Sequence, residues 1–399
     1  MTTTPTSPRR ATLAVGVLFF VNGATFSNWL PRIPEIRDSL GLSNDSLGVT
    51  LLGGGLGGIV GSLIVGRISD RLGSRHLVVL AATLLSIGMP LVAFVPNAPL
   101  LLVVLSALGI LDVLNDVAMN TQGVIAQARM SRPIMNRLHA AWSLGFTSGA
   151  LVGAAAAAAR IGIRWHLCIV GAVLLATVHT VRRRLDPVDP PPTPHTENAG
   201  TAKRQRVSGL AVLVALAAIG AIGLEVLPND WAAVLMRDAF DAGRFAGLGT
   251  VACAGAMLIG RLAGDHVLMR VGEHRLLVGA QVLVGAGAAI TVATPFTAVA
   301  VTGLVVWGLG LSVFFPSLYS MAARLPGTSA GAGLGSMLFG QRSGALLVAV
   351  STGAVGEWQG MRAAFAVVAG VSFVLLAVGM NRLRMAVATP ATPATPAGA

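Results

Sequence analysis

Apolar residues run along this chain in long blocks that short polar segments separate. A helix needs about 20 consecutive apolar residues to cross the hydrocarbon core of a bilayer, and the blocks reach that length. They do not form the one-sided stripes of amphipathic helices, so the pattern indicates membrane spans. We expect twelve spans, over residues 11–31, 46–66, 76–95, 99–125, 138–159, 163–182, 208–236, 244–262, 273–293, 296–323, 327–352 and 361–383.

A polar segment divides the expected spans into two sets of six. It is rich in proline and in charge, which excludes a packed helix. We therefore expect a first six-helix bundle over 1–182, a cytoplasmic linker over 183–207 and a second bundle over 208–386. A low-complexity, disordered tail follows over 387–399. The predicted fold is an all-α membrane protein of two pseudo-symmetric six-helix bundles.

Composition supports this class of protein. The chain is 54% hydrophobic and 11% charged, whereas soluble domains are about 25% charged. Its net charge of +12 comes mostly from arginines between spans and does not indicate nucleic-acid binding. Cys168 and Cys253 fall inside apolar blocks, which is typical of core residues. No metal-ligand cluster or catalytic group stands out, so we expect no enzyme activity, cofactor or metal.

The arginines also predict orientation. If the N-terminus is cytoplasmic, most of the 28 Lys and Arg residues fall between spans on the cytoplasmic side. In this assignment of basic residues to loops, Arg261 belongs to a cytoplasmic loop. The bias predicts a multi-pass protein of the cytoplasmic membrane with both termini inside.

The two halves repeat each other. Gly66 to His76 follows the second expected span, and the similar stretch from Gly260 to Arg275 follows the eighth. Asn28-Trp29 and Asp230-Trp231 also correspond, near the outer ends of the first and seventh spans. Parallel halves joined by a cytoplasmic linker are typical of transporters.

The fourth span carries the most unusual polar residues. Asp112, Asp116 and Asn120 are spaced by four and share one helix face, which Asn115 widens. Lipid cannot solvate such a face, so it indicates a functional site facing protein or water. Two carboxylates so close in a low dielectric do not both ionise easily, which would let one carry a proton. We expect proton coupling at Asp116, shared with Asp112.

Other polar residues inside spans have alternative interpretations. Glu225 is a proton site or part of an outer gate, and Asp230 is an outer-end polar residue. Arg342 lies in the cavity opposite a carboxylate, or near the cytoplasmic surface. His139 either titrates or forms a helix-end hydrogen bond.

We expect substrate contacts from asparagines and tryptophans inside the spans. The two tryptophans could stack on a sugar ring or pack in the core, and both readings stay open. The expected contacts are Asn22, Asn28, Asn115, Asn120, Trp142 and Trp307.

The loop after the second span resembles the signature of the major facilitator superfamily, Gly-x-x-x-Asp-basic-x-Gly-basic-basic. Only Ser74 departs from it, at a usual basic position. In this resemblance Asp70 and its basic neighbours form a conformational gate, and Arg261 and Asp265 are the counterparts in the second half. The matching residues are Gly66, Asp70, Arg71, Gly73 and Arg75.

Shorter stretches resemble the fucose-permease-like branch, whose bacterial members include proteins of unassigned substrate. They are Asp116 to Asn120, Glu225 to Trp231 and Leu138 to Trp142. The acid that fucose permeases carry in the first helix is absent, because the region offers only Asn22 and Asn28. Drug/proton antiporters place an Arg in helix four and a Gly-Pro element in helix five, and this chain has neither.

These observations predict a secondary transporter that works by alternating access. We expect the protein to act as a monomer in the bilayer and to move a small polar solute together with a proton. A sugar or sugar-like metabolite is the first candidate for this solute. Two alternatives stay open: proton-driven efflux of a hydrophobic metabolite or drug, and a membrane sensor that transports nothing.

Overall fold

The computed structural model describes residues 7–130, 134–185, 209–325 and 330–388. All regular structure within these ranges is helical. Most of the expected linker and tail lies outside the described residues.

The described residues of the first half form seven α-helices and three short 3-10 helices. In order they are α1 (Pro8–Ser27), η1 (Leu30–Arg32), α2 (Ile33–Ser39), α3 (Asn44–Leu72), α4 (Ser74–Gly88), η2 (Met89–Ala93), α5 (Ala98–Met130), α6 (Met135–Ala158), α7 (Ile163–Val181) and η3 (Arg182–Arg184).

The second half supplies six α-helices and one short 3-10 helix. In order they are α8 (Gly209–Phe240), η4 (Gly243–Phe245), α9 (Leu248–Ala293), α10 (Thr297–Leu311), α11 (Phe314–Ala323), α12 (Ala330–Gln359) and α13 (Met361–Ala388).

Within the described ranges, 11 helical stretches are long and apolar enough to cross a membrane. They correspond to eleven of the twelve expected spans. The remaining one is α12, a helix of 30 residues that carries Gln341 and Arg342 near its middle. Those two polar residues lower its hydropathy without shortening it, so the expected all-helical fold is confirmed.

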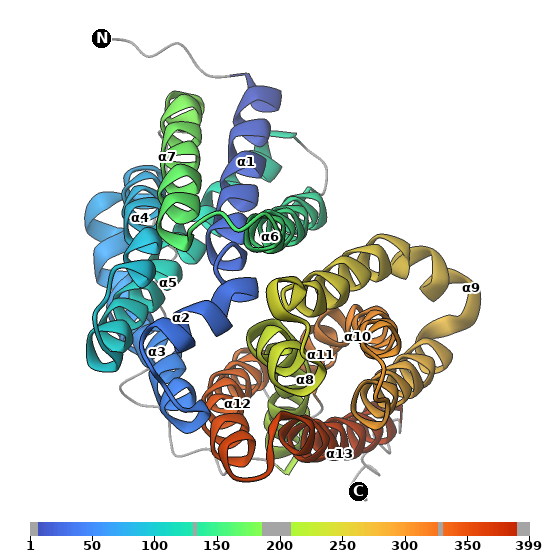
Figure 1. The fold of residues 1–399 in the computed structure, drawn as a ribbon. Helices are drawn as coiled ribbons and strands as arrows, with labels where there is room; N and C mark the ends of the chain where they lie inside the picture. Colours follow the sequence, from blue (N-terminus) through green and yellow to red (C-terminus); the bar gives the residue numbers. More distant parts are fainter. Residues whose placement is uncertain (1–6, 131–133, 186–208, 326–329, 389–399) are drawn as a thin grey trace, which may run out of the picture.

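The helices form two groups (Figure 1). Those of the first half, α1 to α7, are coloured blue to green, and those of the second half, α8 to α13, yellow to red. The halves meet where α3 packs against α12 and where α6 packs against α9. Within the first half, α3 and α5 approach so closely that a Cβ on Gly57 or Gly109 would overlap the other helix's backbone. Glycine at these two positions thus permits the close packing of α3 on α5.

Ion pairs join the halves at one end. Arg37 of α2 pairs with Asp238 of α8 at 2.5 Å, and Arg237 of α8 pairs with Asp38 of α2 at 2.7 Å. We call these four residues the clamp and this end of the molecule the clamp end. The opposite end, which carries Arg184 and Gly209 on either side of the expected linker, is the linker end.

Two glycines mark equivalent bends in the halves. Gly73 ends α3 with φ 73°, and Gly272 bends α9 with φ 78°, a backbone region that glycine adopts at little cost. Arg67 lies six residues before Gly73, whereas Arg261 lies eleven before Gly272. The difference of five residues places Arg261 about 7.5 Å deeper along its helix. The prediction of a loop position for Arg261 was therefore wrong.

Candidate functional site

A cavity of about 930 Å³ lies between the two halves. Residues of α1, α3, α5 and α6 line it from the first half, and residues of α8, α9, α11 and α12 from the second. It extends toward the linker end, where Asn136, Leu268 and Tyr319 form part of its wall. The clamp closes the other end. Its volume suits a small-molecule ligand.

Three side chains form a hydrogen-bonded chain in the wall of the first half. Trp142 Nε1 of α6 donates to Asn22 Oδ1 of α1 at 2.7 Å, and Asn22 Nδ2 donates to Asp112 Oδ1 of α5 at 3.1 Å. The indole also stacks on Phe146, with ring centroids 5.3 Å apart. All of these residues line the cavity. Hydrogen bonds thus connect the carboxylate of Asp112, through the amide of Asn22, to the indole of Trp142.

Asp116 lines the same wall, one helical turn after Asp112. Asn120 Nδ2 donates hydrogen bonds to Oδ1 and to the backbone oxygen of Asp116, both at 2.9 Å. Asn120 does not line the cavity in this state, and these hydrogen bonds hold it against Asp116. The expected direct contact between Asn120 and a substrate does not fit this state.

Basic side chains of other helices approach the carboxylates. The guanidinium of Arg342 in α12 and the imidazole of His139 in α6 lie within electrostatic range of Asp116. The guanidinium of Arg342 packs beside Gly58, in the middle of α3. Arg342 thus lies beside α3 and within electrostatic range of the carboxylates, although it does not itself line the cavity. His139 lines the cavity and contacts Phe19 edge to face, at 5.3 Å between ring centroids.

The second half contributes an arginine that sequence reasoning misplaced. Arg261 Nη2 lies 3.6 Å from Glu225 Oε1 of α8, and Arg261 Nη1 donates to Ser143 Oγ of α6 at 3.0 Å. All three residues line the cavity, so the arginine bridges the halves. Within the described residues, Glu225 Oε2 is buried and has no hydrogen-bond partner. The spacing to Gly272 was the signal that could have revealed the depth of Arg261.

Asp230 lines the cavity on α8, five residues beyond Glu225. It lies on the clamp-end side of Glu225, and its expected outer-end location stays a prediction. In the part of the chain that the structure describes, no group of three or more His, Cys, Asp and Glu side chains could hold a metal ion.

Three expected substrate contacts lie away from the cavity. Asn28 is 2% exposed, donates to Ala24 O at 2.6 Å and lies 3.2 Å from His166 Nε2. Asn115 is 1% exposed, inside the first half. Trp307 is fully buried and donates to Leu224 O at 3.1 Å. In this state none of the three lines the cavity, and their contact with a substrate stays a prediction.

The motif after the second span forms the connection between α3 and α4 at the linker end. Asp70 and Arg71 are exposed, and neither makes an ion pair with another described residue. Ser74, the departure from the basic pattern, is 2% exposed and accepts a hydrogen bond from Gln122 Nε2 at 2.7 Å. A buried serine bonded to α5 explains why a long basic side chain does not occur there. The side chain of Asp265 lies outside the described residues.

The chain was compared with known proteins. It is 26% identical over 359 residues to an uncharacterized MFS-type transporter of Yersinia pestis, covering 88% of this chain and 90% of that one. Its fold is similar to that of the nucleoside transporter NupG, solved as the D323A mutant (TM-score 0.74, 15% identity, 93% and 99% covered). It also resembles a D-xylose-proton symporter (TM-score 0.65, 17% identity, 95% and 96% covered). The profile of the Major Facilitator Superfamily matches residues 15–267, and the chain therefore belongs to that superfamily of membrane transporters.

Proposed function

We propose that this protein is a proton-coupled secondary transporter that carries a small polar solute across the cytoplasmic membrane by alternating access. The observation that carries the proposal is the cavity between the halves, with two adjacent carboxylates in its wall and a clamp across one end. Residues 1–182 and 208–386 would act as the two moving halves, and the linker end would face the cytoplasm.

Alternating access requires contacts that exist in only one state. The clamp is such a contact, since it joins α2 to α8 and must break before the cavity can open at that end. Asp70 and Arg71 are exposed at the other end. They would meet partners there once the linker end closes, which gives the gate residues of the first half their proposed role.

Proton binding would act through the chain from Asp112 to Trp142. A hydrogen bond to a carboxylate is stronger than one to a neutral carboxylic acid. Protonation of Asp112 would therefore weaken its bond from Asn22 and free the amide to turn toward a solute. Asp116 would exchange its proton with the cavity, since it is exposed there and held by Asn120.

The wall also suits a sugar or a sugar-like metabolite. Trp142 presents an aromatic ring beside the amide of Asn22, so a ring face and a hydrogen-bonding group lie together. Amides and carboxylates bind hydroxyl groups in several orientations. The D-xylose-proton symporter shares this fold, which makes proton-driven sugar transport compatible with it.

The test is uptake of labelled solutes by purified protein in vesicles, with and without an imposed proton gradient. We expect a sugar or related polyol to accumulate and the accumulation to collapse with a protonophore. Proton-driven movement of hydrophobic compounds alone would favour efflux. Solute binding without any flux would instead favour the sensor.

A further inference from the structure

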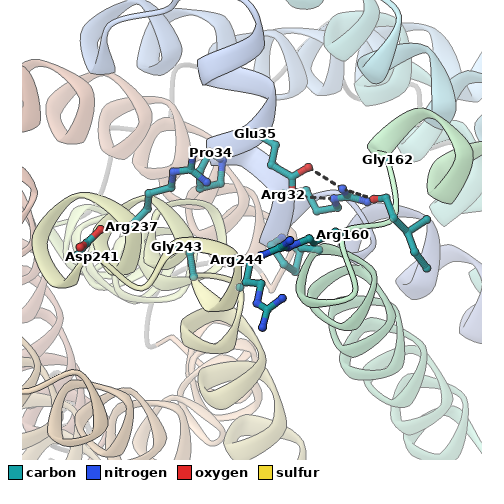
Figure 2. Close-up of a pocket in the computed structure, with 14 residues that line it drawn as sticks. Arg32, Pro34, Glu35, Arg160, Gly162, Arg237, Asp241, Gly243 and Arg244 are labelled. Atoms are coloured by element: carbon teal, nitrogen blue, oxygen red, sulfur yellow. Dashed lines mark hydrogen bonds and ion pairs between the residues drawn. The ribbon is translucent and has the colours of Figure 1, made fainter.

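A second cavity, of about 450 Å³, lies at the clamp end between loops of both halves (Figure 2). The first half contributes η1, α2 and the connection between α6 and α7. The second half contributes the end of α8, η4 and the residues just before α9. This cavity has no lining residue in common with the central one, although η1, α6 and α8 contribute different residues to each.

Arginines dominate the polar part of its wall. Arg32 and Arg160 belong to the first half, and Arg237 and Arg244 to the second, against only two carboxylates, Glu35 and Asp241. The four positive charges therefore exceed the two negative ones.

Part of this positive charge has no counterpart. Glu35 accepts two hydrogen bonds from Arg32, at 3.0 and 2.6 Å, so its carboxylate neutralises Arg32 and not the other arginines. Arg237 pairs with Asp38 of the clamp. In contrast, the side chains of Arg160 and Arg244 form no hydrogen bond or ion pair with any described residue. Their charges are open to a ligand.

Arg32 adds a second sign of an incomplete site. Its side chain is 2% exposed, and among the described residues its Nη1 has no hydrogen-bond partner. A buried guanidinium is normally neutralised and fully hydrogen-bonded. Here Glu35 and Ile161 O satisfy only Nε and Nη2. Glu35 neutralises the charge of Arg32, but the buried side of the wall keeps one donor atom without an acceptor.

Unusual backbone conformations also occur in the wall of this cavity. Among the described residues, Arg160 (φ 58°) and Asp241 (φ 49°) are the non-glycine residues with positive φ, and both line this cavity. Strained residues of this kind cluster at functional sites. Arg160 follows the end of α6, where its N–H bonds Ala157 O and that of Ile161 bonds Ala156 O. Glycine is the usual residue in this cap, so an arginine there needs a reason.

We propose that this cavity binds a phosphate-type oxyanion between Arg160 of the first half and Arg244 of the second. Guanidinium groups match the geometry of such anions and bind them through paired hydrogen bonds. Because each half supplies one of the arginines, the site is complete only while the clamp end is closed. The anion therefore stabilises that state over the state open at the clamp end. The anion is either free phosphate or the phosphate of an anionic lipid headgroup.

The first experiment measures closure of the clamp end in purified full-length protein. An ideal Cβ on Gly356 lies 3.8 Å from Asn44 Cβ across the two halves, the separation found in disulfides. In a background with Cys168→Ser and Cys253→Ala, the pair Asn44→Cys and Gly356→Cys should form a disulfide when this end is closed. We expect inorganic phosphate to raise the cross-linking rate in lipid-free detergent, relative to chloride at equal ionic strength.

A second arm identifies the source of the anion. The same protein is placed in nanodiscs of phosphatidylcholine, with and without phosphatidylglycerol, and without phosphate. Faster cross-linking with phosphatidylglycerol alone assigns the site to a lipid headgroup, and a response to phosphate alone assigns it to the free anion. No response to either would overturn the proposal.

Variants locate the response. Arg244→Gln removes the cation of the second half, and Arg160→Gly removes that of the first while supplying the residue the helix cap favours. Each should weaken the apparent phosphate affinity about tenfold, as expected for loss of a charged hydrogen bond. Arg164→Gln is the matched control, because Arg164 bonds Ala93 O and stacks on Phe94 outside this cavity. Native affinity in both variants would overturn the proposal.

Discussion

The guanidinium of Arg37 in α2 donates two hydrogen bonds to the carboxylate of Asp238 in α8, at 2.5 and 2.8 Å. The adjacent residue of each helix completes the arrangement, since Asp38, which follows Arg37, pairs with Arg237, which precedes Asp238. An Arg-Asp dipeptide of one half thus binds an Arg-Asp dipeptide of the other in a reciprocal way. The clamp joins the two halves, and its two arginines and two aspartates leave no net charge at the contact.

Reversing one charge of the clamp should open this end. Asp238→Arg places a third arginine beside Arg37 and Arg237, and a partly exposed pair of this kind contributes about 1 kcal/mol. We expect the ratio of closed to open molecules to fall about fivefold or more, measured by spin-label distances across the clamp end. Adding Arg37→Asp should restore the native distribution. Unchanged distances in Asp238→Arg would show that the clamp does not hold this end closed.

A covalent link should trap the state seen here. Oxidation of the Asn44→Cys and Gly356→Cys protein joins α3 to α12 at the clamp end. Transport should stop on oxidation and return on reduction, because the clamp end can no longer open. Each single cysteine variant serves as the control. Full transport by the cross-linked protein would rule out alternating access through this contact.

The bridge from Glu225 through Arg261 to Ser143 gives a third prediction. Glu225→Gln leaves the arginine without its carboxylate, and an unneutralised charge inside the membrane is costly. We expect a transport defect, with a larger loss of folded protein than in Ser143→Ala, which removes a single hydrogen bond. Thermal stability and initial uptake rates measure the two effects. A stable and fully active Glu225→Gln protein would contradict the structural importance of this pair.

Much of the architecture was predictable because hydropathy reports spans directly. The depth of a residue within a span was harder, as Arg261 shows. The motif Gly-Arg suggested a loop, but the bend at Gly272 comes five residues later than the equivalent bend at Gly73. The spacing from Arg261 to Gly272 is present in the sequence, but the backbone conformation of the two glycines is what identifies them as equivalent.

The direction in which a polar residue faces was the second difficulty. Asn22 lies in α1 and Asn28 directly follows its last residue, yet six residues of helical geometry place them about 240° apart. One lines the cavity, and the other is buried beside His166. Asn115 lies only about 60° around the helix from Asp112, and that is enough to turn it into the bundle. Packing of neighbouring helices decides these outcomes, and a single sequence does not contain it explicitly.

The structure changes the prediction for Asn120. Since Asn120 orients Asp116 instead of lining the cavity, Asn120→Ala should impair proton coupling more than solute binding. We expect near-native solute affinity and a reduced accumulation ratio. Asn120→Asp adds a negative charge beside Asp116 and should impair coupling further. A selective loss of solute affinity in Asn120→Ala would restore the direct substrate contact.

Asp116→Asn tests the central claim most directly. The amide imitates a permanently protonated carboxyl group, so the variant should bind solute and exchange labelled solute across the membrane. It should fail to accumulate solute against a gradient, while Asp112→Asn should be affected more mildly. The measurement compares proton-driven accumulation with passive exchange in the same vesicles. Exchange without accumulation is the predicted result; accumulation by Asp116→Asn in response to a proton gradient would contradict the coupling role of this carboxylate.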